Sequence, residues 1–184
     1  MRKTLLAVII VSLVGCVSSP DPKLLQFPKF SDTSYVAADG RTWVAHEARR
    51  IGERFYVLEF IPQGAESNRT TEILRFEYHS NLPSIDQLKE ISEDVKKMHD
   101  PAFTYEITPS PSGYIMRYHS PDRHASGVSK TVFREDGGAQ ISYTSRLITD
   151  PEKRLEFWTH YISSLPNQAL QPTPTAGTSA AKQP

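Results

Sequence analysis

The 184-residue chain has little of several features that would narrow its function. It contains a single cysteine, Cys16, so no disulfide can form within the chain. Its 21 Lys and Arg residues balance 21 Asp and Glu residues, so no excess positive charge favours nucleic acid as a partner. Its apolar runs stay well below the ~20 residues that a membrane-spanning helix needs. The length allows one domain rather than two.

The N-terminal segment carries the most distinctive pattern. Two basic residues at positions 2 and 3 precede the apolar run 5–11, which is typical of a secretory signal. Residues 13–16 read Leu-Val-Gly-Cys and resemble the lipobox of bacterial lipoprotein precursors. The resemblance implies cleavage between Gly15 and Cys16, a diacylglycerol on the Cys16 sulfur, and acylation of the new amino terminus. A cofactor is not implied.

Lipidation at Cys16 would determine where the protein is found. One acyl chain holds a protein weakly at a membrane, whereas two or more hold it stably. We therefore expect the protein to be bound to a membrane of the bacterial cell envelope through its N-terminal lipid. Val17 rather than Asp follows Cys16, which in the sorting pattern of enteric bacteria implies the outer membrane, facing the periplasm. The alternative is an ordinary secretory signal with a chance cysteine near its cleavage site.

Changes in composition divide the chain into four parts: a signal peptide over 1–15, a lipidated tether over 16–34, one α+β domain over 35–165, and a disordered tail over 166–184. Residues 17–28 contain three prolines and little periodicity, as expected of a tether. The tail lacks apolar side chains to bury. Removal of 167–184 is therefore expected to leave the melting temperature unchanged.

Hydrophobic periodicity within the domain predicts seven strands and two helices. The predicted strands cover 41–47, 54–61, 71–79, 103–108, 114–120, 130–134 and 139–146. The first helix begins after Ser84, which forms a capping box with Gln87, and is closed by Asp100-Pro101. The second begins at Asp150-Pro151, an N-cap followed by proline at the first helical position, and ends before Pro166.

This order predicts an α+β fold, in which an antiparallel β-sheet of about six to seven strands packs with two helices in the order βββ-α-ββββ-α. The segments 60–64, Phe-Ile-Pro-Gln-Gly, and 68–72, Asn-Arg-Thr-Thr-Glu, resemble a motif of the Mog1 and PsbP group of α-β-α sandwich proteins. The chain lacks the tryptophan of that motif and has one extra residue. A shared fold does not supply a function.

Metal and nucleophile motifs are largely missing. His119, Asp122 and His124 offer the one plausible trio of metal ligands, whereas a zinc site needs three or four converging donors. The alternative is a solvated loop at a strand end. The chain has no Gly-x-Ser-x-Gly elbow, and its only cysteine is the expected lipidation site. We therefore predict no catalytic residues and no metal site.

Two carboxylates, Glu59 and Glu77, lie on neighbouring predicted strands, and a pair at a set separation can hydrolyse glycans. Each has a nearby arginine, Arg54 or Arg75, which favours ordinary ion pairs instead.

Aromatic side chains suggest a binding face. Tyr114, Met116 and Tyr118 alternate along one predicted strand, so they share a face that an exposed position would make available for binding. The alternative is that these side chains pack under the two helices.

The leading hypothesis from the sequence is a non-enzymatic binding or adaptor domain, anchored in the cell envelope and acting on an envelope protein partner. A second hypothesis is a periplasmic immunity or inhibitor protein against a toxin or cell-wall hydrolase. A third is an envelope hydrolase whose catalytic residues form no recognisable motif.

Overall fold

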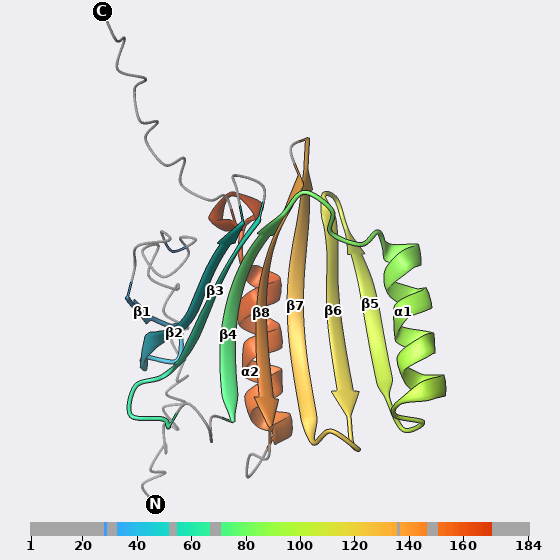
Figure 1. The fold of residues 1–184 in the computed structure, drawn as a ribbon, viewed down its shortest axis with the longest axis horizontal. Helices are drawn as coiled ribbons and strands as arrows, with labels where there is room; N and C mark the ends of the chain where they lie inside the picture. Colours follow the sequence, from blue (N-terminus) through green and yellow to red (C-terminus); the bar gives the residue numbers. More distant parts are fainter. Residues whose placement is uncertain are drawn as a thin grey trace, which may run out of the picture.

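The computed structural model describes residues 28, 33–51, 55–66, 71–135, 137–146 and 151–170. The predicted signal peptide, Gly15, Cys16 and most of the predicted tether lie outside these residues. Within them the chain forms one sheet of eight strands with two α-helices, as Figure 1 shows.

The sheet consists of two antiparallel meanders that meet in the middle. Along the sheet the order is β1-β2-β3-β4-β8-β7-β6-β5. The first meander contains β1 (Ser34–Val36), β2 (Thr42–Ile51), β3 (Phe55–Pro62) and β4 (Glu72–His79); the second contains β5 (Thr104–Ser110), β6 (Gly113–Ser120), β7 (Ala125–Arg134) and β8 (Gly137–Arg146). Antiparallel pairing of β4 with β8 joins the two meanders, from Glu72 opposite Ser145 to His79 opposite Gly138.

The α+β class predicted from the sequence is confirmed, but the strand count and order differ. The described residues form eight strands in the order ββββ-α-ββββ-α, because β1 precedes the first predicted strand. This strand has only three residues, too few to show a period of two in the sequence. It is held by pairing with Thr42–Val44 of β2. β7 also begins five residues earlier than predicted, in a stretch of small side chains that carries little hydrophobic signal.

The first helix, α1 (Ile85–Met98), begins at the predicted capping box. The Ser84 side chain accepts a hydrogen bond from the Gln87 amide at 3.3 Å, and the Gln87 side chain accepts one from the Ser84 amide at 2.9 Å. The chain crosses from β4 to the far edge of the sheet, where α1 lies beside β5 (Figure 1). The helix therefore connects the two meanders and borders β5.

The second helix, α2 (Pro151–Ser164), lies behind the sheet in Figure 1 and packs on β7 and β8. The predicted N-cap, Asp150, lies outside the described residues. Trp158 of this helix stacks on Tyr143 of β8, with ring centroids 4.6 Å apart, and meets Trp43 of β2 edge to face at 5.8 Å. Aromatic packing therefore holds α2 against the middle of the sheet.

Each face of the sheet can be identified by its register. We call the face that α2 covers the helix face; it carries Leu74, Tyr143 and Val128 at directly opposite positions. The opposite face carries Arg75, Ser142, Ser129 and Met116. Figure 1 is viewed onto this opposite face, which no helix covers within the described part of the chain.

The folded domain extends past the predicted boundary at residue 165. Residues Asn167–Leu170 form a short 3-10 helix, η2, and the Leu170 side chain is 2% exposed within the core. The Asn167 side chain donates a hydrogen bond to the Ser112 hydroxyl in the turn between β5 and β6. These four residues therefore belong to the fold rather than to the predicted tail.

Candidate functional site

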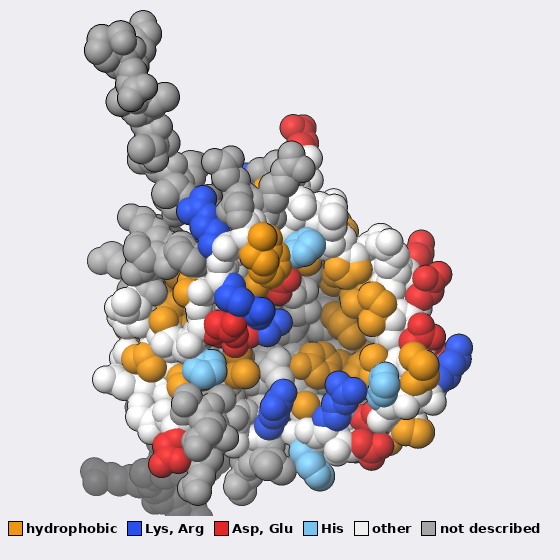
Figure 2. Space-filling view, in the orientation of Figure 1, with side chains coloured by type: hydrophobic (Ala, Val, Ile, Leu, Met, Phe, Trp, Pro, Cys, Tyr) orange, Lys and Arg blue, Asp and Glu red, His pale blue; other side chains and the backbone are white. Residues whose placement is uncertain are grey.

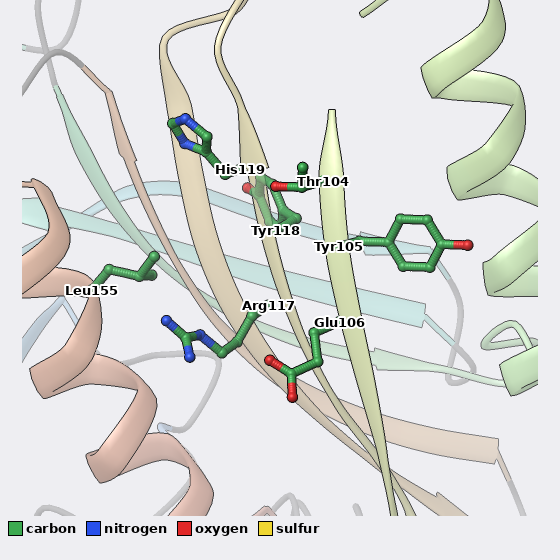
Figure 3. A pocket seen from close by; sticks show the side chains of 7 residues that line it. All are labelled: Thr104, Tyr105, Glu106, Arg117, Tyr118, His119 and Leu155. Atoms are coloured by element: carbon green, nitrogen blue, oxygen red, sulfur yellow. The ribbon is translucent and has the colours of Figure 1, made fainter. Parts of the chain in front are cut away.

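The helix face is hollowed where the cover by α2 ends. α2 packs on β7 and β8 and does not reach the edge of the sheet. An open hollow of about 300 Å³ therefore remains between the helix and strands β6 and β5. It is lined by Thr104, Tyr105 and Glu106 of β5, by Arg117, Tyr118 and His119 of β6, and by Leu155 of α2, as Figure 3 shows.

Two opposite charges in this hollow face each other across the strands. Glu106 and Arg117 are directly opposite in the register of β5 and β6, and both side chains are exposed. Neither forms a hydrogen bond or ion pair with any residue that the structure describes. In Figure 3 the Arg117 side chain reaches toward α2, from which Leu155 points back, whereas Tyr105 points away toward α1. The hollow thus offers a cation, an anion and an apolar group.

His119 completes the polar rim of the hollow. Its Nδ1 atom lies 2.8 Å from the Ser126 hydroxyl, and Thr104 is directly opposite it on β5. A serine and a histidine at this distance resemble part of a hydrolase site. Ser126, however, is only 6% exposed and lies within a regular strand, so a substrate has little access to its hydroxyl.

The three residues considered as metal ligands in the sequence, His119, Asp122 and His124, are not grouped as a metal site in the structure. Among the described residues, no three His, Cys, Asp or Glu side chains come close enough together to hold a metal ion. His124 ends the turn between β6 and β7, where its amide donates to the carbonyl of Pro121 at 3.0 Å.

The predicted binding residues Tyr114, Met116 and Tyr118 lie together on the opposite face of the sheet. Tyr114 has no exposed surface, and its hydroxyl donates to the Pro83 carbonyl at 3.3 Å, so its ring belongs to the core. The Tyr118 hydroxyl lies 3.0 Å from that of Thr144, and its ring covers Gly127 so closely that a Cβ there would meet the ring at 2.5 Å. Burial raises the pKa of both tyrosines.

Met116 is the member of this set with an apolar neighbourhood open to solvent. It is half-buried and lies directly opposite Ile107 of β5. The neighbouring helix α1 exposes two apolar side chains of the predicted stripe, Ile91 at 52% and Met98 at 68%. Figure 2 shows hydrophobic side chains gathered over β5, β6 and the adjoining part of α1. We call Ile107 and Met116 the sheet patch.

The two carboxylates considered for glycan hydrolysis are both ion-pair partners of Arg75. The Arg75 Nε atom donates to Glu59 at 2.7 Å, and its guanidinium lies 3.9 Å from the Glu77 carboxylate. Arg54, the other expected partner, lies outside the described residues. The ion-pair interpretation therefore accounts for both acids.

A second buried acid, Glu72, was not identified from the sequence. Burial by itself raises its pKa, but hydrogen bonds from Arg41, Tyr143 and Arg154 lower it to about 2. The Arg154 bond is 2.7 Å long and links the first turn of α2 to β4. The available signal was the position of Glu72 in its strand, because it shares the face of Leu74 and the other apolar residues.

Lys130 is another buried charge that the sequence analysis missed. It lies in β7 on the helix face, 6% exposed, and its ammonium donates to the Leu165 carbonyl and, at 3.5 Å, to that of Ser163. These carbonyls lie at the C-terminal end of α2, where a cation is favourable. Burial lowers the pKa of Lys130. Its contacts are those of a helix cap.

Comparisons with protein-family models, with curated proteins and with solved structures find no match for this chain. The lipoprotein and Mog1/PsbP resemblances remain predictions from the sequence. No helix in the described ranges has both the length and the apolar character needed to span a membrane.

Proposed function

We propose that the chain is a membrane-anchored bacterial lipoprotein whose α+β domain is a non-enzymatic binding or adaptor module in the cell envelope. Its partner is an envelope protein, bound on the opposite face of the sheet. The observation that carries the proposal is the sheet patch, Ile107 and Met116, on a face without a covering helix in the described residues.

Burial of apolar surface supports a protein partner for this face. Apolar side chains of an antiparallel sheet are normally covered, and each square ångström of apolar surface removed from water contributes roughly 25 cal/mol. Met116 is flanked by Tyr105 and Tyr118, whose rings are held by their own contacts. A preorganised surface of this kind loses little entropy on binding.

The lipid anchor suits such a module, because two or more acyl chains at Cys16 would hold the domain close to envelope proteins. The expected location is the outer membrane, facing the periplasm, and no enzymatic step, metal or cofactor is part of the proposal. A periplasmic immunity or inhibitor protein would bind through a surface in the same way, so the identity of the partner distinguishes these two functions.

The test combines membrane fractionation with crosslinking and pull-down from envelope extract. We expect the wild type to be triacylated at Cys16, to fractionate with the membrane and to pull down one stoichiometric partner. The Cys16→Ala variant should no longer fractionate with the membrane. Met116→Glu should lose the partner, because it places a charge at the centre of the sheet patch. Ile51→Glu is the matched control, since Ile51 is an exposed apolar residue near the other end of the sheet.

Two outcomes would overturn the proposal. An unlipidated, soluble wild-type protein would remove the anchor. A partner that binds Met116→Glu and wild type equally well would show that the sheet patch is not the binding surface.

A further inference from the structure

The hollow on the helix face contains two opposite charges that are not paired with each other. Glu106 and Arg117 occupy directly opposite positions of an antiparallel pair, where opposite charges normally attract across the strands. No ion pair joins them, and neither bonds to another residue in the described part of the chain. Both side chains are exposed, so a ligand can bind either charge without first breaking a contact.

We propose that this hollow binds a small zwitterion of the amino-acid type. The ligand's carboxylate lies on the Arg117 guanidinium, its ammonium lies on the Glu106 carboxylate, and its apolar side chain packs against Leu155. This site is on the other side of the sheet from the sheet patch, so the inference does not rest on the proposed function.

The spacing of the two charges fits such a ligand. Directly opposite residues of an antiparallel pair have Cβ atoms about 5 Å apart, so a molecule that carries both charges a few ångströms apart reaches both side chains. A guanidinium also binds a carboxylate through two parallel hydrogen bonds. The zwitterion therefore neutralises both partners at once.

The remaining residues of the hollow set the size and polarity of the ligand. Its volume of about 300 Å³ lies at the lower end of the range for small-molecule sites, roughly 300–1,000 Å³. The side chains of Thr104 and His119 are exposed at one end and offer hydrogen bonds to the carboxylate. Leu155 lies on the α2 side, toward which Arg117 reaches (Figure 3). An apolar amino acid matches this arrangement better than a bare inorganic anion.

Calorimetric titration of the purified full-length chain with three related compounds tests the proposal. L-leucine carries both charges, N-acetyl-L-leucine lacks the ammonium, and L-leucinamide lacks the carboxylate. We expect leucine to bind at least about tenfold more tightly than either analogue, since each charged hydrogen bond contributes about that factor. Equal binding of leucine and leucinamide would overturn the proposal, as would no binding of leucine at tens of millimolar.

Two variants then assign the charges to residues. Arg117→Ala should weaken the binding of leucine about tenfold. The affinity for leucinamide should not change, because leucinamide has no carboxylate that Arg117 could bind. Glu106→Gln should weaken leucine and leave N-acetyl-leucine unchanged. Lys97→Ala, which removes an exposed cation of α1 outside the hollow, should bind like wild type.

The folded state of each variant is checked by thermal melting, and Arg117→Lys provides a second test that keeps the charge. Lysine lacks the planar guanidinium, so Arg117→Lys should bind leucine with an intermediate affinity. If N-acetyl-leucine binds as tightly as leucine, the site recognises an anion only and the zwitterion is wrong. These titrations do not depend on whether an envelope protein binds the sheet patch. The zwitterion site and the proposed function can therefore be refuted independently of each other.

Discussion

The Glu72 carboxylate accepts two hydrogen bonds from the Arg41 guanidinium, at 2.8 and 2.9 Å, across a sequence separation of 31 residues. Arg41 also pairs with Asp39 and lies over the Trp43 ring, with its Cζ atom 5.0 Å from the ring centroid. Since Arg154 of α2 bonds to the same carboxylate, one acid joins the start of β2, the start of β4 and the helix. This ionic group fixes α2 over the aromatic core.

Glu72→Gln should destabilise the fold by about 1–3 kcal/mol, because two arginines lose the anion that they share, while their own side chains stay partly exposed to water. The effect depends on pH. The pKa of Glu72 is about 2 in the folded protein and 4.5 ordinarily, so the folded state binds fewer protons in this window and wild-type stability falls as pH drops through it. Urea unfolding between pH 7 and pH 2 should show a smaller fall for the variant. The control is Glu90→Gln, at an exposed position of α1. Its stability should fall with decreasing pH by as much as that of the wild type.

Trp158→Ala should cost about 3–5 kcal/mol, because it removes a fully buried indole that stacks on Tyr143. Trp158→Phe should cost clearly less, since the indole Nε1–H is buried and has no acceptor among the described residues. Phe157→Ala is the neighbouring control, because its ring is 42% exposed. Chemical denaturation measures all three. A Phe157→Ala effect as large as that of Trp158→Ala would contradict the central role of Trp158.

Lys130→Met should alter how stability depends on alkaline pH. Burial places the pKa of Lys130 below its ordinary value of 10.5, so the unfolded chain binds more protons than the folded protein in that window. Wild-type stability therefore rises with pH there relative to Lys130→Met, which has no such proton. The quantity to measure is the difference in the free energy of unfolding between the two proteins, because tyrosines contribute to the alkaline pH dependence of both. A constant difference would show that Lys130 does not titrate differently on folding.

Two truncations test the C-terminal boundary. Removal of 171–184 keeps Leu170 and should leave the melting temperature unchanged. Removal of 167–184 takes away a buried leucine worth about 1.5–3 kcal/mol and should lower the melting temperature by roughly 5 °C or more. This replaces the expectation from the sequence alone that 167–184 is dispensable. Equal melting temperatures of the two truncated chains would show that the folded domain ends before residue 166, as the sequence predicts.

Local patterns made much of the secondary structure predictable. The capping box of Ser84 and Gln87 involves residues three apart, so the sequence displays both partners. The alternation of Leu74, Phe76 and Tyr78 likewise assigns β4 and its buried face. The three-residue β1 was missed, because its pairing with β2 rather than its own pattern makes it a strand.

The candidate sites were less predictable, because they depend on strands that are neighbours only in the folded sheet. Tyr114 and Tyr118 were correctly placed with Met116 on one face, but the sequence did not show that the Pro83 carbonyl binds the Tyr114 hydroxyl. Glu106 and Arg117 drew no attention, since an exposed acid and an exposed base are ordinary until a hairpin sets them opposite each other beside Leu155.

The sequence by itself determined the elements with a regular period, the start of α1 and the α+β class, because these follow from interactions within a few residues. It also carries the lipobox-like segment 13–16, from which the proposed anchor derives. Only the tertiary structure decided that β4 pairs with β8, and this pairing brings Glu72 to Tyr143 across 71 residues. Contacts of that separation are selected by the packing of the whole sheet against α2, and no local pattern encodes them.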